Sequence, residues 1–351
     1  MSDVADLIKK SAGWLSDEGE ESEIVLSSRV RLARNLDDWP FSHIASSEVL
    51  ESIRSEVSAA VMENGLLEDP LLMEMDGMSG ADRLLLAERR LISHEMVMNF
   101  KNRALIVDMD ESLGVMVNEE DHLRMQSMES GLSLRKAFKK ITRFDDELDR
   151  RLDFAFSNRL GYLTACTTNV GTGLRVSAMV HLPGLVHNHD IRQVIDGLRQ
   201  VRLTVRGSYG EGSDVTGNMF QISNSITLGL SEEDTVVNME SHIRKVLEFE
   251  KKARESLLRE ARTLLEDKVW RSYGLLKTAR LVTSKEAMSL VSAIRLGVGL
   301  NIISDVKLSV LNEILIMIQP MHLQHLYGNE MKAEERDRTR ADYIRSRLEG
   351  R

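Results

Sequence analysis

Hydrophobic positions follow two different periods along the chain, and the change between them divides the sequence. Up to about residue 254, stretches of alternating apolar and polar residues are mixed with stretches of helical spacing, whereas beyond it the strand pattern almost vanishes. We therefore predict an α+β fold over residues 1–253, with a mainly antiparallel sheet flanked by helices, and an all-α domain over residues 254–351.

The predicted elements are set by this spacing and by turn or cap residues at their ends. Helices are predicted over residues 4–15, 46–64, 132–156 and 190–200, and from the N-cap-like run 231–234 to beyond residue 260. Strands are predicted over residues 24–32, 104–109, 113–118, 122–128, 203–206 and 218–227, with two more flanking the segment around Cys166. The short loops within 104–128 favour antiparallel hairpins.

Composition excludes several classes of protein. The 351 residues are 42% hydrophobic and 29% charged, enough to bury a substantial core, and no run of eighteen apolar residues or signal peptide is present, so we expect a cytoplasmic protein without membrane contact. The formal net charge of −9 argues against direct nucleic-acid binding. The histidines lack metal-ligand spacing, so no directly bound metal is predicted, and His187 with His189 fits a solvated turn better than a zinc site.

Three segments concentrate residue types that carry chemistry. The only cysteine, Cys166, precedes two threonines, a glycine turn and Arg175. Residues 118–124 place three adjacent carboxylates before a histidine and an arginine, and residues 206–212 open a glycine-rich loop between an arginine and a glutamate. Read singly, each segment also fits a plainer role: a buried core cysteine, a solvated turn and a surface turn.

Taken together, these segments resemble the catalytic domain of the phosphagen (guanidino) kinases. The resemblance rests on Ser-Ser-Arg-Val-Arg at 27–31, Asn-Glu-Glu-Asp-His-Leu-Arg at 118–124, Cys-Thr-Thr-Asn-Val-Gly-Thr-Gly-Leu-Arg at 166–175 and Arg-Gly-Ser-Tyr-Gly-Glu at 206–211, in the family's order. It covers roughly residues 24–254. Because Arg29 and Arg31 are two apart in a predicted strand, they point to one face.

Three features make the chain similar to the branch of that family that acts on arginine side chains in proteins. Few residues precede the first motif, whereas the small-molecule enzymes carry a helical N-terminal domain there. The family's Arg-x-Ser-x-His pattern is Arg-Val-Ser-Ala-Met at 175–179, and Arg-Asp-Arg-Thr-Arg-Ala at 336–341 fits that branch's Arg-Asp-x-x-Arg-Ala motif. The expected function is ATP-dependent phosphorylation of protein arginine residues.

The resemblance implies where ATP and its magnesium bind. A Walker loop is absent, so side chains must hold the triphosphate, and arginine forks suit phosphate oxygens. The implied ATP-binding positions are Ser27, Ser28, Arg29, Val30, Arg31, Arg124, Arg175, Val176, Ser177, Ala178, Met179, Arg206, Gly207, Ser208, Tyr209, Gly210 and Glu211.

The resemblance also implies how the acceptor is activated. A guanidinium has a pKa above about 12 and becomes a nucleophile only after losing a proton. Glu120 and Glu211 are expected to grip it, with Glu120 as general base, while Glu119 reaches magnesium through water. Cys166, as a thiolate, is expected to lie against the remaining guanidinium nitrogen.

At the C-terminus, Arg336, Asp337, Arg340 and Ala341 are expected to bind phosphoarginine allosterically, although a charged helix face with local ion pairs fits the same spacing. The implied partners are proteins with exposed arginine, an activator protein, a Clp protease that degrades marked clients, and a second copy in a homodimer, with a role in stress regulation. Two alternatives stay open: a kinase of a free guanidino compound and a noncatalytic phosphoarginine-binding adaptor.

Two positions depart from the family pattern. Many relatives have proline directly after the cysteine, where this chain has Thr167, and they tend to have histidine where this chain has Arg90. Arg90 is therefore left out of the predicted nucleotide contacts.

Overall fold

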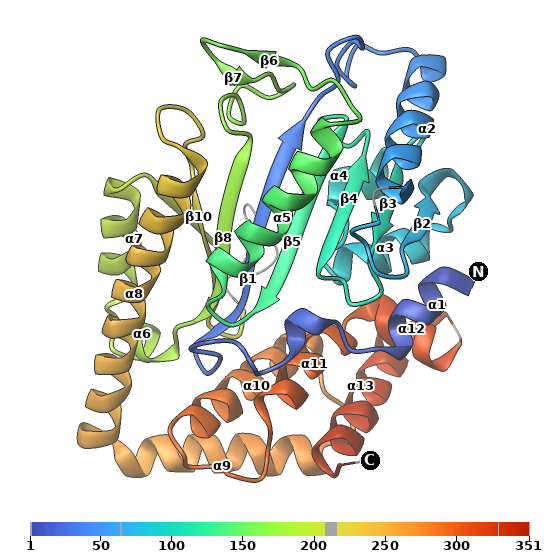
Figure 1. The fold of residues 1–351 in the computed structure, drawn as a ribbon. Coiled ribbons are helices and arrows are strands. Elements are labelled where there is room, and N and C mark those ends of the chain that lie inside the picture. The colour runs from blue at the N-terminus through green and yellow to red at the C-terminus, as the bar shows by residue number, and fades with distance from the viewer. Residues whose placement is uncertain (1, 64, 208–215, 329, 351) are drawn as a thin grey trace.

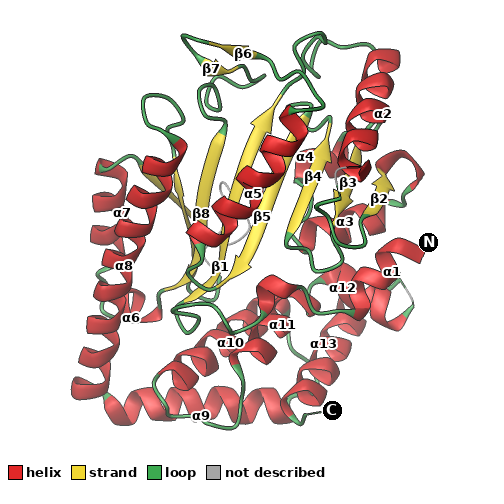
Figure 2. Ribbon diagram, viewed as in Figure 1, coloured by secondary structure: helices red, strands yellow, loops and turns green. Residues whose placement is uncertain are grey.

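The computed structural model describes residues 2–63, 65–207, 216–328 and 330–350. Its centre is an eight-stranded sheet in the order β2-β3-β4-β5-β1-β8-β10-β9, in which every pair of neighbours is antiparallel (Figures 1 and 2). The strands are β1 (Val25–Arg34), β2 (Leu71–Glu74), β3 (Ala104–Val107), β4 (Leu113–Val117), β5 (Leu123–Ser130), β8 (Leu174–His181), β9 (Leu203–Gly207) and β10 (Met219–Asn224). A separate hairpin joins β6 (Phe156–Ser157) to β7 (Gly161–Tyr162).

Helices border the sheet and make up the C-terminal part of the chain. Those of the first part are α1 (Ser2–Lys9), α2 (Ser47–Glu63), α3 (Gly80–Glu88), α4 (His94–Met98), α5 (Leu134–Asp149), α6 (Pro183–His187), α7 (Ile191–Gln200) and α8 (Glu232–Glu260), with short 3-10 turns η1 (Gly13–Leu15) and η2 (Met75–Gly77). Those that follow are α9 (Arg262–Thr278), α10 (Ser284–Gly299), α11 (Leu308–Met317), α12 (Pro320–Tyr327) and α13 (Ala333–Leu348). Among the described residues after α8 there is no strand.

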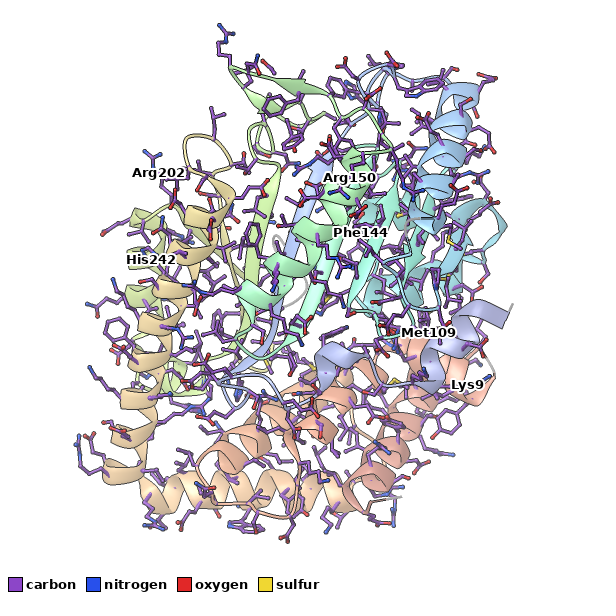
Figure 3. The ribbon with its side chains drawn as sticks, viewed as in Figure 1. Lys9, Met109, Phe144, Arg150, Arg202 and His242 are labelled. Atoms are coloured by element: carbon purple, nitrogen blue, oxygen red, sulfur yellow. The ribbon has the colours of Figure 1, made fainter. Side chains whose placement is uncertain are left out.

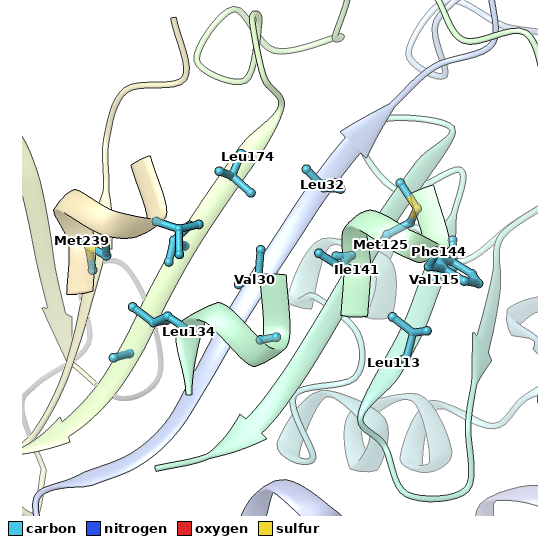
Figure 4. Packing of buried hydrophobic residues seen from close by; sticks show 14 of the residues in the cluster. Val30, Leu32, Leu113, Val115, Met125, Leu134, Ile141, Phe144, Leu174 and Met239 are labelled. Atoms are coloured by element: carbon cyan, nitrogen blue, oxygen red, sulfur yellow. The ribbon is translucent and has the colours of Figure 1, made fainter. Parts of the chain in front are cut away.

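One face of the sheet is buried under α5 and α8. Alternate residues of β1, such as Val30 and Leu32, join the main apolar cluster because successive side chains of a strand point to opposite faces. Figure 4 shows α5 lying across the strands with Leu134 and Ile141 in this cluster. On the same helix Phe144 is fully buried, whereas Arg150 at its C-terminal end has a 70% exposed side chain (Figure 3). The opposite face carries polar groups over β1, β5, β8 and β9, and apolar residues where it meets other helices.

A second apolar cluster joins the helical part to the sheet. It contains residues from α9, α10, α11 and α13 together with Met128, Met179 and Met219 from three strands. Figure 1 shows these helices beneath one end of the sheet. The predicted boundary at residues 253 and 254 lies inside α8, which runs through it as one continuous helix.

Most predicted elements are confirmed, with shifted ends. The Ser231 side chain caps α8 by accepting a hydrogen bond from the backbone N–H of Asp234 at 3.0 Å, as the sequence indicates. The prediction of a helix to residue 156 is wrong, because the chain leaves α5 after Asp149 and the N–H of Ala155 donates to the carbonyl of Asn35 at 2.8 Å. The predicted helix 4–15 is interrupted after Lys9, and β2, α3, α4 and α6 were not predicted.

A buried ion cluster around Arg34 fastens the sheet to its covering helices. The guanidinium donates to both carboxylate oxygens of Asp145 on α5, at 3.1 and 2.7 Å, and approaches Glu232 on α8 at 3.3 Å. It also donates to the carbonyl of Thr172 at 2.8 Å and lies 3.5 Å from the centre of the Tyr162 ring. Because Arg34 is fully buried, losing it leaves carboxylates in the core without their partner.

We predict that Arg34→Met lowers the free energy of unfolding by about 3–5 kcal/mol, measured by urea denaturation. The control is Arg150→Met, which removes an exposed pair with Glu147 and should cost about 0.5 kcal/mol or less. The double variant Arg34→Met, Asp145→Asn should recover part of the lost free energy of unfolding, because it also removes the unpaired carboxylate charge of Asp145. Equal effects of the two single substitutions would contradict the prediction.

Candidate functional site

Five arginines from four strands, β1, β5, β8 and β9, lie on the face of the sheet that α5 and α8 do not cover. The register pairs Arg31 with Arg175 across β1 and β8, and Arg206 with Gln221 across β9 and β10. The Arg29 guanidinium donates to the side-chain oxygen of Gln221 at 3.4 Å, so all four arginines share this face. Arg124 lies on β5 next to β1, two residues from Gln126, the register partner of Arg31. We call Arg29, Arg31, Arg124, Arg175 and Arg206 the arginine cluster.

The arginine cluster is electrostatically crowded. Burial, followed by the charges of Arg90, Arg124 and Arg175, lowers the pKa of Arg29 to about 9. Burial and the charges of Arg29, Arg124 and Arg175 hold the pKa of Arg31 well below its ordinary value, and its buried Nε lacks a hydrogen-bond partner among the described residues. Such a cluster is stabilised by any anion that enters it, above all one with several phosphates.

The turn between β4 and β5 presents two glutamates with different surroundings. Glu119 is buried, and its carboxylate accepts from Arg124 Nη1 at 2.6 Å, Ser93 Oγ at 2.5 Å and the backbone N–H of Glu120 at 2.9 Å. Burial raises the pKa of Glu119, but these partners outweigh burial, and the pKa lies below its ordinary value. Glu120 is exposed, and its Oε2 accepts from Asn169 Nδ2 at 3.4 Å, so it faces the cysteine loop. A carboxylate can accept further hydrogen bonds beyond this one.

The cysteine lies in a compact turn beside this acid. The carbonyl of Cys166 accepts from Thr164 Oγ1 at 2.8 Å and from the N–H of Asn169 at 3.0 Å, and the partly exposed sulfur lies 3.0 Å from Thr168 Oγ1. Burial, followed by the charges of Arg206 and Arg124, lowers the pKa of Arg175, and the proximity of Cys166 and Glu120 opposes this only in part. Arg175 is therefore close to the cysteine, to the acid and to Arg206 at once.

Two residues that sequence reasoning missed hold these segments together. Asn35, just after β1, donates to Asp121 Oδ1 at 2.7 Å and to the carbonyl of Leu163 at 3.1 Å, and accepts from the N–H of His122 at 2.9 Å. Asp121 Oδ1 also accepts from the N–H of Ala165 at 2.7 Å. Because these bonds join β1, the acidic turn and the cysteine loop, Asn35 and Asp121 set the distance between Glu120 and Cys166.

Arg90 also lies beside the arginine cluster, although its departure from the family pattern argued against a nucleotide contact. Its carbonyl accepts from Gln126 Nε2 at 3.2 Å, which places its backbone against the polar face of the sheet. Its charge is the largest electrostatic contribution to the lowered pKa of Arg29. The signal that could have found it is its position, since it directly precedes the strand-like Leu91-Ile92 and the Ser93 that holds Glu119.

Not every predicted site residue faces the arginine cluster. Val30, Val176 and Ala178 belong to the apolar core, and Ser28 Oγ donates to the carbonyl of Gly131 at 2.8 Å. Ser177 pairs with Arg29, and Ser27 and Met179 pair with each other on the cluster's side of the sheet. Gly207 ends β9. Ser208, Tyr209, Gly210 and Glu211 lie outside the described residues.

The predicted C-terminal site lies on α13. Arg340 is buried and donates to the carbonyls of Ile318 at 3.1 Å and Val282 at 2.9 Å, and to Asp337 Oδ1 at 2.5 Å. Arg336 is partly exposed and donates to the carbonyl of Met331 at 2.7 Å. Ala341 is buried. The two guanidinium groups therefore have different surroundings: one holds the helical domain together and the other reaches its surface.

Within the described ranges, no group of three or more histidine, cysteine or acidic side chains could hold a metal ion. In the same part of the chain, none of the helices has both the length and the apolar character required to cross a bilayer.

Sequence and structure comparisons extend these observations. Residues 52–253 match the C-terminal catalytic domain of ATP:guanido phosphotransferases, and residues 262–351 match the protein-arginine kinase McsB C-terminal domain. The protein-arginine kinase of Symbiobacterium thermophilum is 45% identical over 95% of this chain and 96% of its own, and that of Geobacillus stearothermophilus is 43% identical over 96% and 93%.

Solved structures are similar in fold. A lombricine kinase aligns with a TM-score of 0.59 at 23% identity over 70% of both chains. The duplicated taurocyamine kinase from Schistosoma mansoni with bound transition state analog components aligns with a TM-score of 0.60 at 27% identity, over 77% of this chain and 39% of its own.

The crowding of the arginine cluster yields a prediction about ligand-free stability. Arg31→Met should raise the free energy of unfolding by about 1 kcal/mol, because it removes a buried cation and its repulsion. The same substitution should abolish the rise in melting temperature that tripolyphosphate causes in the unaltered protein. As a control, Arg54→Met removes contacts with the carboxylates of Glu51 and Asp76, which lie outside the cluster. It should preserve the rise in melting temperature with tripolyphosphate. A less stable Arg31→Met protein that still responds to tripolyphosphate would overturn the prediction.

Proposed function

The chain belongs to the protein-arginine kinases of the ATP:guanido phosphotransferase family, and we propose that the arginine cluster, Glu120 and Cys166 form its catalytic site. It is an enzyme that phosphorylates arginine and uses ATP with magnesium. The observation that carries the proposal is the position of Arg175, whose pKa is affected at once by Arg206, Arg124, Cys166 and Glu120. Groups from segments far apart in sequence thereby meet at one point.

We assign the triphosphate of ATP to the arginine cluster. Planar guanidinium groups bind phosphate oxygens in pairs and keep their charge, so they can align the γ-phosphate and spread the charge that develops during transfer. Arg124 is oriented for this task by Glu119 at 2.6 Å. Glu119, whose oxygens accept from Ser93 and Arg124, would reach the magnesium carried by ATP through water.

We assign the acceptor arginine to the space between Glu120 and Cys166. Glu120 would take a proton from the guanidinium, whose nitrogen lone pair then attacks the γ-phosphorus as the bond to the β-phosphate oxygen breaks and ADP leaves. A thiolate at Cys166 would stabilise the charge on the neighbouring guanidinium nitrogen. Glu211, outside the described residues, is the proposed second grip.

We further propose that phosphoarginine binds at the motif on α13 and regulates this site. The support is a continuous set of contacts. Asp337 and Arg340 hold both backbone groups of Val282, which precedes the N-cap of α10. Further along α10, Ser292 Oγ contacts His181 Nε2 at 2.8 Å and Asn218 Nδ2 at 2.9 Å, at the ends of β8 and β10. A shift of α10 would thus reach two strands that carry or contact the arginine cluster.

The remaining assignments rest on family membership alone. We propose that the marked proteins are degraded by a Clp protease under stress, that an activator protein is required, and that the enzyme acts as a homodimer in the cytoplasm.

The catalytic assignment predicts arginine phosphorylation that depends on Glu120 and Cys166. The enzyme, magnesium ATP and an unstructured arginine-rich protein are incubated, and phosphate is located by mass spectrometry at neutral pH. Glu120→Gln should lower kcat about 100-fold or more, because the general base is lost, and Cys166→Ala about tenfold. Glu147→Gln, at a partly exposed position on α5, is the matched control and should leave kcat unchanged.

The outcome also separates the alternatives. Phosphate on serine or tyrosine alone would refute the assignment. Faster phosphorylation of free arginine than of protein arginine would identify a small-molecule kinase. Binding of phosphoarginine without any phosphoryl transfer would identify an adaptor.

The regulatory assignment predicts that binding and response can be separated. Arg336→Ala should weaken phosphoarginine binding, measured by calorimetry, at least about tenfold, because one charge-assisted contact is lost. Ser292→Ala should keep the binding but reduce the change in kcat/KM that phosphoarginine causes. Exposed Arg338→Ala serves as the control on the same helix. If Arg336→Ala and Arg338→Ala bind phosphoarginine equally well, the assignment fails.

A further inference from the structure

A pocket of about 780 Å³ opens beside the proposed acceptor position. Glu119, Glu120 and Ala165 form one side of it, so it borders the general base and the residue before Cys166. Among the described residues, none of the arginine cluster lines it. The proposed triphosphate position therefore lies outside this pocket.

Apolar residues line the pocket among polar and charged ones. The apolar ones are Ala165, Leu50 on α2, Met98 at the end of α4, and Phe100 two residues later. Met98 is 75% exposed, so its side chain lies at the rim of the pocket, where an entering apolar group can cover it. The Phe100 ring is covered from behind by the Arg83 guanidinium, 3.8 Å from its centre, so it is fixed in place.

The pocket is also preformed. Asn118 Nδ2 donates to the carbonyl of Leu50 at 2.7 Å and to that of Asn102 at 2.9 Å, which joins α2 to the segment behind Phe100. The N–H of Asn102 donates to Asp76 Oδ2 at 2.8 Å. A ligand entering the pocket thus meets walls that are already ordered, and little conformational entropy is lost on binding.

An arginine within a protein brings its neighbours with it. Each extended residue spans about 3.3–3.6 Å, so residues one or two positions from the target arginine must pass over surface close to Glu120. The pocket is the concave surface that begins there. Charges of both signs line the pocket: Glu95 lies 3.7 Å from Arg103, and Lys101 is exposed. A charged residue next to the target arginine would therefore bind little better than an uncharged one.

We propose that this pocket is the subsite for the residue beside the target arginine, and that Met98 and Phe100 make it select an apolar side chain. The proposal rests on the proposed function, because it assumes that the acceptor guanidinium lies at Glu120. It adds a substrate preference: unfolded or locally opened segments with leucine, methionine or phenylalanine next to arginine are better substrates than polar ones.

The test uses synthetic peptides with a single arginine in a Gly/Ser background. In one peptide both neighbours are glycine, and in others one neighbour is leucine, aspartate or lysine, placed before or after the arginine. We expect kcat/KM for a leucine peptide to be about tenfold higher than for the glycine peptide, chiefly through a lower KM, because burial of one apolar side chain supplies this factor.

Substitutions assign the preference to the pocket. Met98→Ser should reduce the advantage of leucine to about twofold or less, and Met98→Leu should retain it. Leu264→Ser on α9, which alters a side chain of similar exposure far along the chain, is the matched control and should retain it as well. The rise in melting temperature with ADP should be the same in all three variants, because the pocket lies outside the nucleotide site.

Equal kcat/KM for glycine and leucine peptides, a larger advantage for aspartate or lysine, or a leucine advantage unaffected by Met98→Ser would each overturn the proposal. These results differ from failure of the proposed function, in which no peptide would receive phosphate on arginine at all.

Discussion

Like-charge repulsion on one face of the sheet is the constraint on which the rest of the structure depends. Arginines on neighbouring strands face each other with few opposing carboxylates, and burial together with this repulsion lowers the pKa of Arg29 to about 9. Such a face cannot stabilise the sheet by itself. The apolar packing of α5 and α8 on the other face does so, together with the buried contacts of Arg34 to both helices. The covered face thus allows the open face to stay charged and ready for an anion.

The proposed catalytic groups need a second kind of support, because Glu120 and Cys166 lie in segments that do not pair as strands. Backbone hydrogen bonds of the sheet fix the arginine cluster, but the acidic turn and the cysteine loop extend beyond the strands. Between these segments, side-chain hydrogen bonds of Asn35 and Asp121, 2.7 to 3.1 Å long, take the place of backbone pairing. A buried amide and a buried carboxylate that are fully partnered hold one geometry, since any displacement leaves a polar group unsatisfied. The position of Glu120 relative to Cys166 therefore depends on Asn35 and Asp121, which have no proposed contact with ATP or the acceptor arginine.

Much of this architecture could be predicted from the sequence, and the failures have physical reasons. Strands β1, β5 and β8 alternate apolar and polar residues because one face is core and the other is the site, so their pattern is strong. The segment from β2 to α4 was missed because its elements are short and their apolar residues lack a clear period. The end of α5 was missed because a tertiary bond from Ala155 to Asn35 overrides local helical spacing. The role of Asn35 has no local signal, since all its partners are distant in sequence.

Packing of apolar residues also joins the helical domain to the catalytic sheet. The arginine cluster lies on the face whose lower rows, at Met128 and Met179, pack into the helical domain. Strands of the cluster therefore end in the packing of another domain, where Ser292 contacts the end of β8 and the residue before β10 through polar bonds. Packed interfaces switch between discrete arrangements more readily than they deform gradually. A small change near Val282, just before α10, therefore has a mechanical route to the arginine cluster. The pocket at Met98 is held by other contacts, those of Asn118 and Asn102.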